Sequence, residues 1–116
     1  FNELERRAKN QERFGVVVLD PPKFARSKTG VEDALRGYRR LMSLGVQLLE
    51  EEGFLVMCCC SGRITSAMLE ELLAQVAASA KRDVQLLERR GPSPDHPVSA
   101  SCLESHYLKC LVSRVR

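Results

Sequence analysis

The stretch that decides the fold is Val16-Val17-Val18-Leu19-Asp20-Pro21-Pro22-Lys23-Phe24. Its four consecutive apolar residues, three of them β-branched, predict a strand that is buried on both faces. The two prolines prevent a strand or a helix from continuing, so the chain is expected to leave the sheet at Asp20. In doubly wound sheets, ligands bind outside the carboxyl ends of the parallel strands. Residues 20–24 are therefore predicted to lie where the chemistry takes place.

The sequence on either side of this stretch predicts alternating helices and strands. Residues 1–13 resemble the end of a charged surface helix. From Val31, apolar residues recur with a 3.6 period and predict a helix of about five turns, with Gly53 as its stop. A second apolar run, Phe54–Cys60, predicts a second buried strand. Because a helix separates the two strands, we expect a right-handed βαβ unit with parallel, adjacent strands.

The second half of the chain continues this order. Thr65 or Ser66 can cap the next amphipathic helix. Residues 84–88 predict a shorter strand near a sheet edge. Residues 107–115 predict a last strand that returns antiparallel, since no helical crossover is predicted before it. The whole chain thus reads as one α/β unit.

Composition narrows the class of protein. The chain has 116 residues, 44% of them hydrophobic, and a formal net charge of +3, which are ordinary values for one globular domain. Aromatic residues make up only 5%, which argues against a sheet that stacks RNA bases. No apolar run is long enough to span a bilayer, and the charged N-terminus is unlike a signal peptide. We therefore expect a cytoplasmic protein with no membrane partner.

The five cysteines predict reduced thiols. Their number is odd, and their positions (58, 59, 60, 102 and 110) form no disulfide framework and no C-x-x-C pair. No metal site is expected from this spacing. A mixed site formed by Cys102, His106 and a strand cysteine remains the alternative.

Five stretches carry a resemblance to a known family: Asp20-Pro21-Pro22-Lys23-Phe24, Gly37-Tyr38-Arg39, Cys60-Ser61-Gly62, Asp95-His96-Pro97-Val98 and Tyr107-Leu108-Lys109. In this order they resemble the class I S-adenosylmethionine-dependent methyltransferases, and more narrowly the large-subunit ribosomal RNA cytosine-5 methyltransferase I family. The resemblance implies a Rossmann-like sheet of seven strands with helices on both faces. This chain would supply the fourth to seventh strands, with the last one antiparallel between the fifth and sixth.

The same resemblance implies that residues 1–116 are the C-terminal part of a catalytic domain. The glycine-rich turn with which the family's first half binds the methyl donor has no counterpart in this sequence. We therefore expect the donor-binding N-terminal half to be absent, and this chain alone to bind S-adenosylmethionine weakly or not at all. The implied macromolecular partner is ribosomal RNA.

The family's chemistry implies a cysteine nucleophile. A thiolate that adds to carbon 6 of cytosine makes carbon 5 nucleophilic enough to accept a methyl group. The resemblance places this role on Cys60, where a nearby helix N-terminus would favour the thiolate. Cys58 projects to the same strand face and is the alternative nucleophile. The structural alternative is that all three strand cysteines simply pack in the sheet.

The remaining site residues follow from the same resemblance. Asp20 would bind the ring nitrogen and amino edge of the base, and with Pro21 it would also contact the donor. Phe24 would stack on the flipped base or, alternatively, cover the core. The residues predicted to bind substrate are Pro21, Pro22, Lys23, Phe24, Ser61, Arg26 and Arg39. Further candidates for phosphate contacts are Lys28, Arg36, Arg40 and Arg63.

Two other functions stay open from the sequence. Asp-Pro-Pro-aromatic motifs also serve methylation of exocyclic nitrogens, which needs no cysteine. The chain could instead be a non-catalytic fragment that self-associates as a homodimer, because the edge of the strand at Val16 would be exposed.

Overall fold

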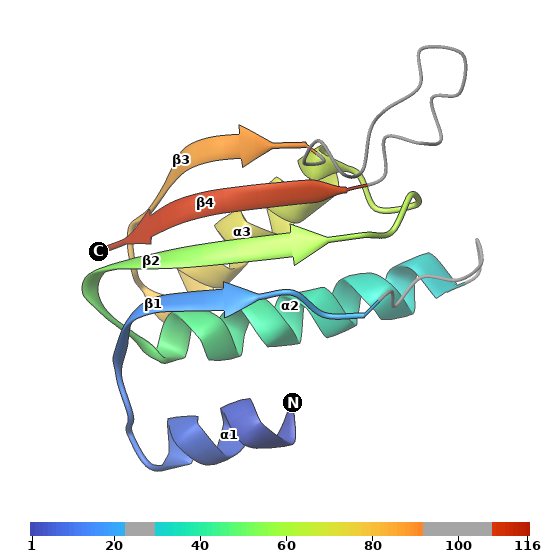
Figure 1. Ribbon diagram of the computed structural model, residues 1–116. Coiled ribbons are helices and arrows are strands. Elements are labelled where there is room, and N and C mark those ends of the chain that lie inside the picture. The colour runs from blue at the N-terminus through green and yellow to red at the C-terminus, as the bar shows by residue number, and fades with distance from the viewer. Residues whose placement is uncertain (23–29, 92–107) are drawn as a thin grey trace.

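The computed structural model describes residues 1–22, 30–91 and 108–116 (Figure 1). Its elements, in chain order, are α1 (Asn2–Lys9), β1 (Phe14–Leu19), α2 (Val31–Gln47), β2 (Leu49–Cys59), α3 (Ser66–Ala80), β3 (Val84–Arg90) and β4 (Lys109–Val115). Several predicted site residues lie outside the described ranges: Lys23, Phe24, Arg26, Lys28, His96, Cys102, His106 and Tyr107.

The four strands form one sheet in the order β1-β2-β4-β3. β1 and β2 are parallel neighbours, as expected for two strands joined by a helix. β4 lies between β2 and β3 and is antiparallel to both. β3 therefore occupies a sheet edge. These three features confirm the predicted topology.

Both long helices, α2 and α3, pack against the same face of this sheet (Figure 1). Strand residues on that face are buried, among them Leu19, Leu55 and Leu111. Tyr38, Met42 and Val46 meet them from α2, and Leu69, Leu73 and Val76 from α3. The core is thus a single layer of side chains between the sheet and two helices.

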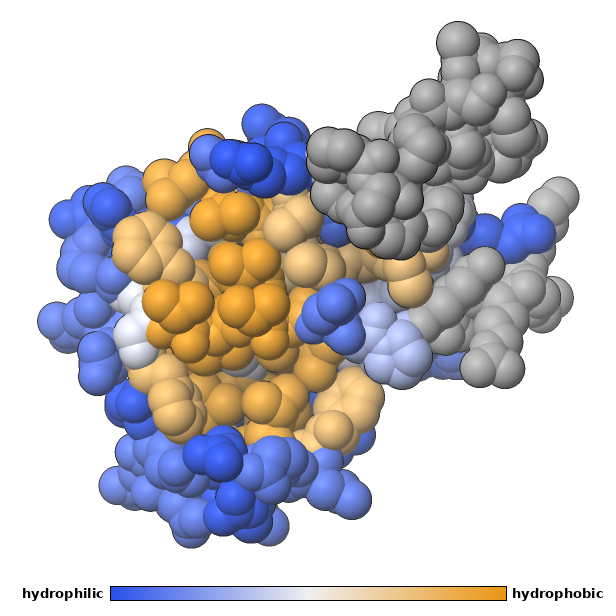
Figure 2. Space-filling model, in the orientation of Figure 1, coloured by the Kyte–Doolittle hydropathy of each residue, from blue (hydrophilic) through white to orange (hydrophobic). Residues whose placement is uncertain are grey.

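The opposite face of the sheet is open over the described residues. Side chains alternate along a strand, so Val17 is buried while Val16 and Val18 are 56% and 61% exposed. Figure 2 shows apolar residues gathered on this open face. α1 does not cover it, because α1 packs beside α2, where Glu5 pairs with Arg40. The predictions of a strand buried on both faces and of helices on both faces are therefore wrong for this part of the chain.

The junction between α2 and β2 also differs from prediction. The helix ends at Gln47, and residues 50–52 lie in β2 instead of the last helical turn. Arg82 stabilises the early ending, since its guanidinium donates hydrogen bonds to the carbonyl of Val46 at 2.8 Å and to that of Leu49 at 2.8 Å. Gly53 does not stop the helix. It allows close packing, because a Cβ there would lie 3.2 Å from the Gly15 carbonyl oxygen.

The ends of α3 follow local chemistry. Thr65 is the N-cap, and its hydroxyl accepts a hydrogen bond from the Met68 amide at 3.1 Å. Of the two caps that the sequence predicts, Thr65 and Ser66, it is therefore Thr65 that caps the helix. At the other end Lys81 adopts a left-handed conformation (φ 55°), in the region that glycine occupies most easily.

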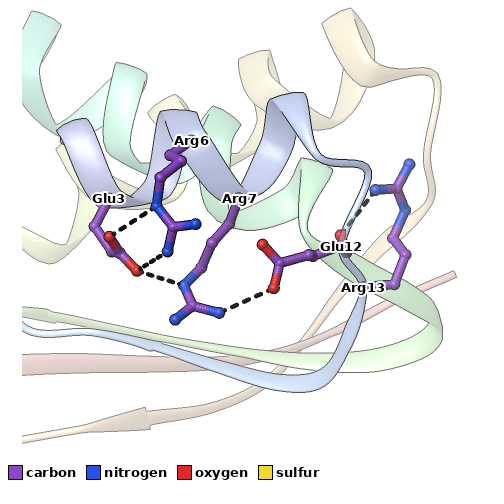
Figure 3. Close-up of polar contacts among 5 residues, drawn as sticks. All are labelled: Glu3, Arg6, Arg7, Glu12 and Arg13. Carbon is purple, nitrogen blue, oxygen red and sulfur yellow. Dashed lines mark hydrogen bonds and ion pairs between the residues drawn. The ribbon is translucent and has the colours of Figure 1, made fainter.

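Charged residues fix the path from α1 into β1 (Figure 3). α1 ends at Lys9, earlier than predicted. Arg7 then bridges Glu3 at 2.8 Å and Glu12 at 3.0 Å, so one side chain ties the helix to the connection that follows it. Solvent screens such exposed pairs, so they contribute little to stability. In the part of the chain described, no helix has the length and apolar character needed to cross a membrane.

Candidate active site

The ends of β1 and β2 lie side by side. Leu19 pairs with Met57 in the parallel register, so Asp20 leaves the sheet next to Cys58. Asp20 and Pro22 are exposed and Pro21 is partly buried. The register thus places Asp20 beside the cysteine run, and the sequence predicts this neighbourhood of the two strand ends.

A cavity of about 420 Å³ opens at the carboxyl end of β1. Its lining comes from α1, from α2 and from the end of β1, and consists of Phe1, Leu4, Val18, Leu19, Asp20, Pro21, Pro22 and Leu41. Most of these side chains are apolar, and Asp20 is the one carboxylate among them. A planar ring or an apolar ligand edge would fit such a lining, with Asp20 as its polar anchor.

The three adjacent cysteines occupy different environments. Cys59 faces the helices and is buried, and its thiol donates a hydrogen bond to the Tyr38 hydroxyl at 3.4 Å. This thiol therefore packs and anchors α2 against the sheet.

Cys58 lies on the open face opposite Cys110 of β4, and the two sulfur atoms are 3.5 Å apart. Burial raises the pKa of the Cys58 thiol to about 12, and the hydrogen bond to Cys110 acts in the same direction. The negative charge of Asp20 acts on the pKa of Cys58 in the same direction. Cys58 is consequently a poor source of thiolate near neutral pH.

Cys60 follows directly after β2 and is partly exposed. α3 begins only at Ser66, so a turn separates this cysteine from the helix, and the expected helix N-terminus beside Cys60 is not found. The turn is held internally. The Ser61 hydroxyl accepts a hydrogen bond from the Arg63 amide at 3.4 Å, and the Ser61 carbonyl accepts one from Lys109 Nζ at 2.6 Å.

Basic residues proposed for phosphate contacts are partly engaged elsewhere. Arg36 pairs with Asp33 within α2. Arg40 pairs with Glu5 and lies over the Phe1 ring. Arg39, the third arginine of this helix, is exposed. Within residues 1–22, 30–91 and 108–116, no cluster of three or more histidine, cysteine or acidic residues could hold a metal ion.

Three residues around the cysteines are not distinguished as site residues by sequence reasoning: Tyr38, Lys109 and Cys110. Tyr38 and Lys109 lie within two of the family-like stretches, Gly37-Tyr38-Arg39 and Tyr107-Leu108-Lys109, which is the signal that marks them. Cys110 carries no such signal, because its role depends on the register that pairs it with Cys58.

The sequence of this chain is similar to those of several named proteins. No family model matches the chain. It is 44% identical over 102 residues to a Ribosomal RNA large subunit methyltransferase I from Shewanella frigidimarina, which covers 88% of this chain and 26% of that protein. A protein of the same name from Tolumonas auensis is 41% identical over 114 residues, covering 98% of this chain and 29% of the relative. The chain therefore spans between a quarter and a third of these relatives' length.

The fold is shared with methyltransferases of known structure. One of them, a protein described as a methyltransferase and crystallised with SAH, superimposes with a TM-score of 0.78 at 21% identity. The alignment covers 98% of this chain and 29% of that one. The resemblance drawn from the sequence is thus confirmed: the chain is a homologue of the Ribosomal RNA large subunit methyltransferase I proteins, with a Rossmann-like class I methyltransferase fold.

Proposed function

We propose that this chain supplies the base-binding half of the active site of an S-adenosylmethionine-dependent ribosomal RNA methyltransferase, which modifies carbon 5 of cytosine through Cys60. The observation that supports the proposal is the parallel register of β1 and β2, in which Leu19 pairs with Met57, so that Asp20 follows β1 next to Cys58 of β2. The name of the relatives supports the ribosomal RNA substrate, and such an enzyme would act in the cytoplasm.

The environments of the three cysteines support Cys60 as the nucleophile. Cys59 is buried and bonded to Tyr38, so a base could not reach it. The raised pKa of Cys58 keeps that thiol protonated. Cys60 is partly exposed and stands at the end of the strand, where a base can approach. Exposure and position therefore favour Cys60 over its neighbours.

Covalent addition is the step for which the cysteine is needed. The Cys60 thiolate forms a bond to carbon 6 of the ring, and the electrons of the 5,6 double bond make carbon 5 nucleophilic. S-adenosylmethionine supplies the electrophilic methyl group. A base then removes the proton on carbon 5, the double bond re-forms, and the Cys60 sulfur leaves. In this scheme Asp20 holds the polar edge of the base, which must first be flipped out of its helix.

Binding of the methyl donor is only partly provided by the described residues. Asp20 and Pro21 would contact it from the cavity at the end of β1. However, none of the described glycines has the positive φ that a tight phosphate- or nucleotide-binding turn often uses. We therefore propose that residues 1–116 belong to the C-terminal part of a larger catalytic domain, whose other part holds most of the donor.

A methyl-transfer assay on unmodified large-subunit ribosomal RNA tests the proposal. The assay compares this chain with a longer chain extended upstream by a donor-binding half. We expect activity only in the longer chain, loss of activity on Cys60→Ala, and retained activity on Cys58→Ala. Nucleoside analysis should identify 5-methylcytidine. Activity that survives Cys60→Ala would contradict the assignment of Cys60 as the nucleophile. A methyl group on an exocyclic nitrogen would show that the enzyme is instead an N-methyltransferase of the Asp-Pro-Pro-aromatic type.

Self-association of the isolated chain is a second candidate property. β1 is an edge strand, and Val16 and Val18 on it are more than half exposed. Exposed apolar edge strands tend to pair with another chain. We therefore propose that two copies of this chain associate through β1.

A further inference from the structure

We propose that Cys58 and Cys110 form a thiol–disulfide exchange site, at which a small organic disulfide converts the two thiols into a cross-link between β2 and β4, with Cys110 reacting first. The proposal goes beyond methyl transfer, because neither sulfur is the one assigned to the base. It comes from the register of the four strands and from the charges that this register places on the open face of the sheet.

The strand register sets the two cysteines directly opposite each other. Cys58 of β2 pairs with Cys110 of β4 in the antiparallel ladder, and their sulfur atoms are 3.5 Å apart. Directly opposite residues have Cα atoms about 4.5–5.5 Å apart, within the span of about 4.4–6.8 Å that a disulfide needs. Rotation of the two side chains is therefore enough to form the cross-link, and the register need not change.

Both thiols are within reach of a small reagent. They lie on the open face of the sheet, and both are partly exposed. Cys59, by contrast, faces the helices and is buried. Among the cysteines that the structure describes, register and exposure together therefore favour Cys58 and Cys110 as partners.

Cys58 has surroundings that keep its thiol protonated. Burial is the largest cause that raises its pKa, to about 12, and the hydrogen bond to Cys110 is the next. Asp20, which leaves β1 next to Cys58, acts in the same direction. A protonated thiol is a poor nucleophile, so Cys58 is the slower of the two to attack a reagent.

Cys110 has a cation beside it instead. β3 lies on the other side of β4, and its Arg90 pairs in register with Cys110. The pKa of Arg90 is raised mainly by its hydrogen bond to Glu88, and an ionised Cys110 raises it further, so the guanidinium and this sulfur are close enough to interact. This polarity across the sheet favours Cys110 as the sulfur that attacks first.

The exchange takes place in two balanced steps. The Cys110 thiol gives up its proton and its sulfur attacks one sulfur of the reagent, so that a mixed disulfide forms and one reagent thiolate leaves. The Cys58 thiol then loses its proton and attacks the Cys110 sulfur, which releases the second reagent thiolate. This second attack is intramolecular, which offsets the small thiolate fraction of Cys58. The two protons end on the two reagent thiols, and two electrons pass from the chain to the reagent.

Treatment of the reduced chain with oxidised glutathione, followed by alkylation and tryptic peptide mapping, tests the proposal. Trypsin places Cys110 in residues 110–114 and the three strand cysteines together in residues 41–63. We expect the link between these two peptides to exceed every other cysteine link by about tenfold or more, since the fold holds the two thiols side by side. Dithiothreitol should reverse it. A main product that links Cys102 would overturn the proposal.

Single serine variants identify the partner of Cys110. Cys58→Ser should lower the yield of the link by about tenfold, whereas Cys60→Ser, the matched control two residues further along, should leave it unchanged. Persistence of the link in Cys58→Ser, or its loss in Cys60→Ser, would overturn the proposal. In urea the unchanged chain should lose its preference for this link. The same preference in urea would contradict a selection by the fold.

The order of attack has its own test. Exchange stops at a mixed disulfide on Cys110 in Cys58→Ser, and on Cys58 in Cys110→Ser. We expect glutathione to add to Cys110 about threefold or more faster than to Cys58. An equal or faster reaction of Cys58 would contradict the role given to Cys110.

A pair of arginine variants tests the polarity across the sheet. In the Cys58→Ser background, Arg90→Gln should slow addition to Cys110 by about twofold, since solvent screens part of the effect of an exposed cation. Arg89→Gln is the matched control, because Arg89 pairs with Glu70 of α3 and should leave the rate unchanged. Equal rates in the two variants would contradict the polarity.

Discussion

The hydroxyl group of Tyr38 lies 3.4 Å from the sulfur of Cys59, and this contact joins the middle of α2 to the carboxyl end of β2. Both side chains are buried. The contact fixes where the helix crosses the strand end that carries Cys60, so the position of the candidate site depends on packing behind the sheet.

We expect Tyr38→Phe to lower the free energy of unfolding by about 1 kcal/mol, because the buried Cys59 thiol loses its acceptor while the ring still packs. Urea denaturation measures the change. In a double-mutant cycle with Cys59→Ala, the two effects should be less than additive. Full additivity would mean that the contact contributes nothing.

The raised pKa of Cys58 predicts instability at alkaline pH. A thiol with an ordinary pKa of 9.0 in the unfolded chain and about 12 in the folded one keeps its proton longer when folded. Its contribution to stability is complete below pH 9 and is lost as the pH rises through about 12. Cys58→Ala should therefore flatten the fall in unfolding free energy over this range. Parallel curves for the two proteins would rule out this source of the pH dependence.

Arg82 should be one of the most sensitive positions outside the candidate site. Its guanidinium donates to the carbonyls of Val46, Leu49 and Glu50 at 2.8–2.9 Å, where α2 passes into β2. We expect Arg82→Ala to cost about 2–4 kcal/mol of unfolding free energy, because several backbone acceptors lose a charged donor at once.

Arg89→Ala provides the control for this measurement. Arg89 pairs with Glu70 at 2.7 Å on the surface, where solvent screens the pair, so its loss should lower the free energy of unfolding much less than Arg82→Ala does. Equal losses of unfolding free energy for Arg82→Ala and Arg89→Ala would show that the hydrogen bonds of Arg82 contribute no more to stability than a surface ion pair.

Lys81→Gly should stabilise the chain by about 0.5–1 kcal/mol. Lys81 ends α3 in the left-handed region, which glycine adopts without steric cost. Thermal and urea denaturation of the two proteins test this directly. A loss of stability would indicate that contacts of the Lys81 side chain stabilise the fold by more than the left-handed backbone conformation costs.

Self-association through β1 predicts a mass that depends on concentration in sedimentation velocity. Replacing Val16 and Val18 with lysine should abolish it, since charges on an edge strand oppose pairing. Leu87→Lys changes an exposed apolar residue on β3, at the other sheet edge, and should leave association unaltered. A monomer at every concentration would refute association.

Local sequence patterns are enough to predict the helices and strands and their order. Two apolar runs with a helical period between them define β1, α2 and β2, and a hydroxyl at Thr65 or Ser66 marks the start of α3. These signals are local, because secondary structure depends on residues a few positions apart. The same is true of the turn that the two prolines impose after Asp20.

The environment of each side chain depends instead on contacts between elements that are distant in the sequence. Val16 and Val17 look alike in sequence, yet only Val17 is buried in the core. β4 gives Cys58 and the turn after Cys60 different neighbours: Cys110 lies opposite Cys58, and Lys109 donates a hydrogen bond to the carbonyl of Ser61. Residues about 50 positions apart meet through strand register and helix packing, and no local pattern encodes those contacts.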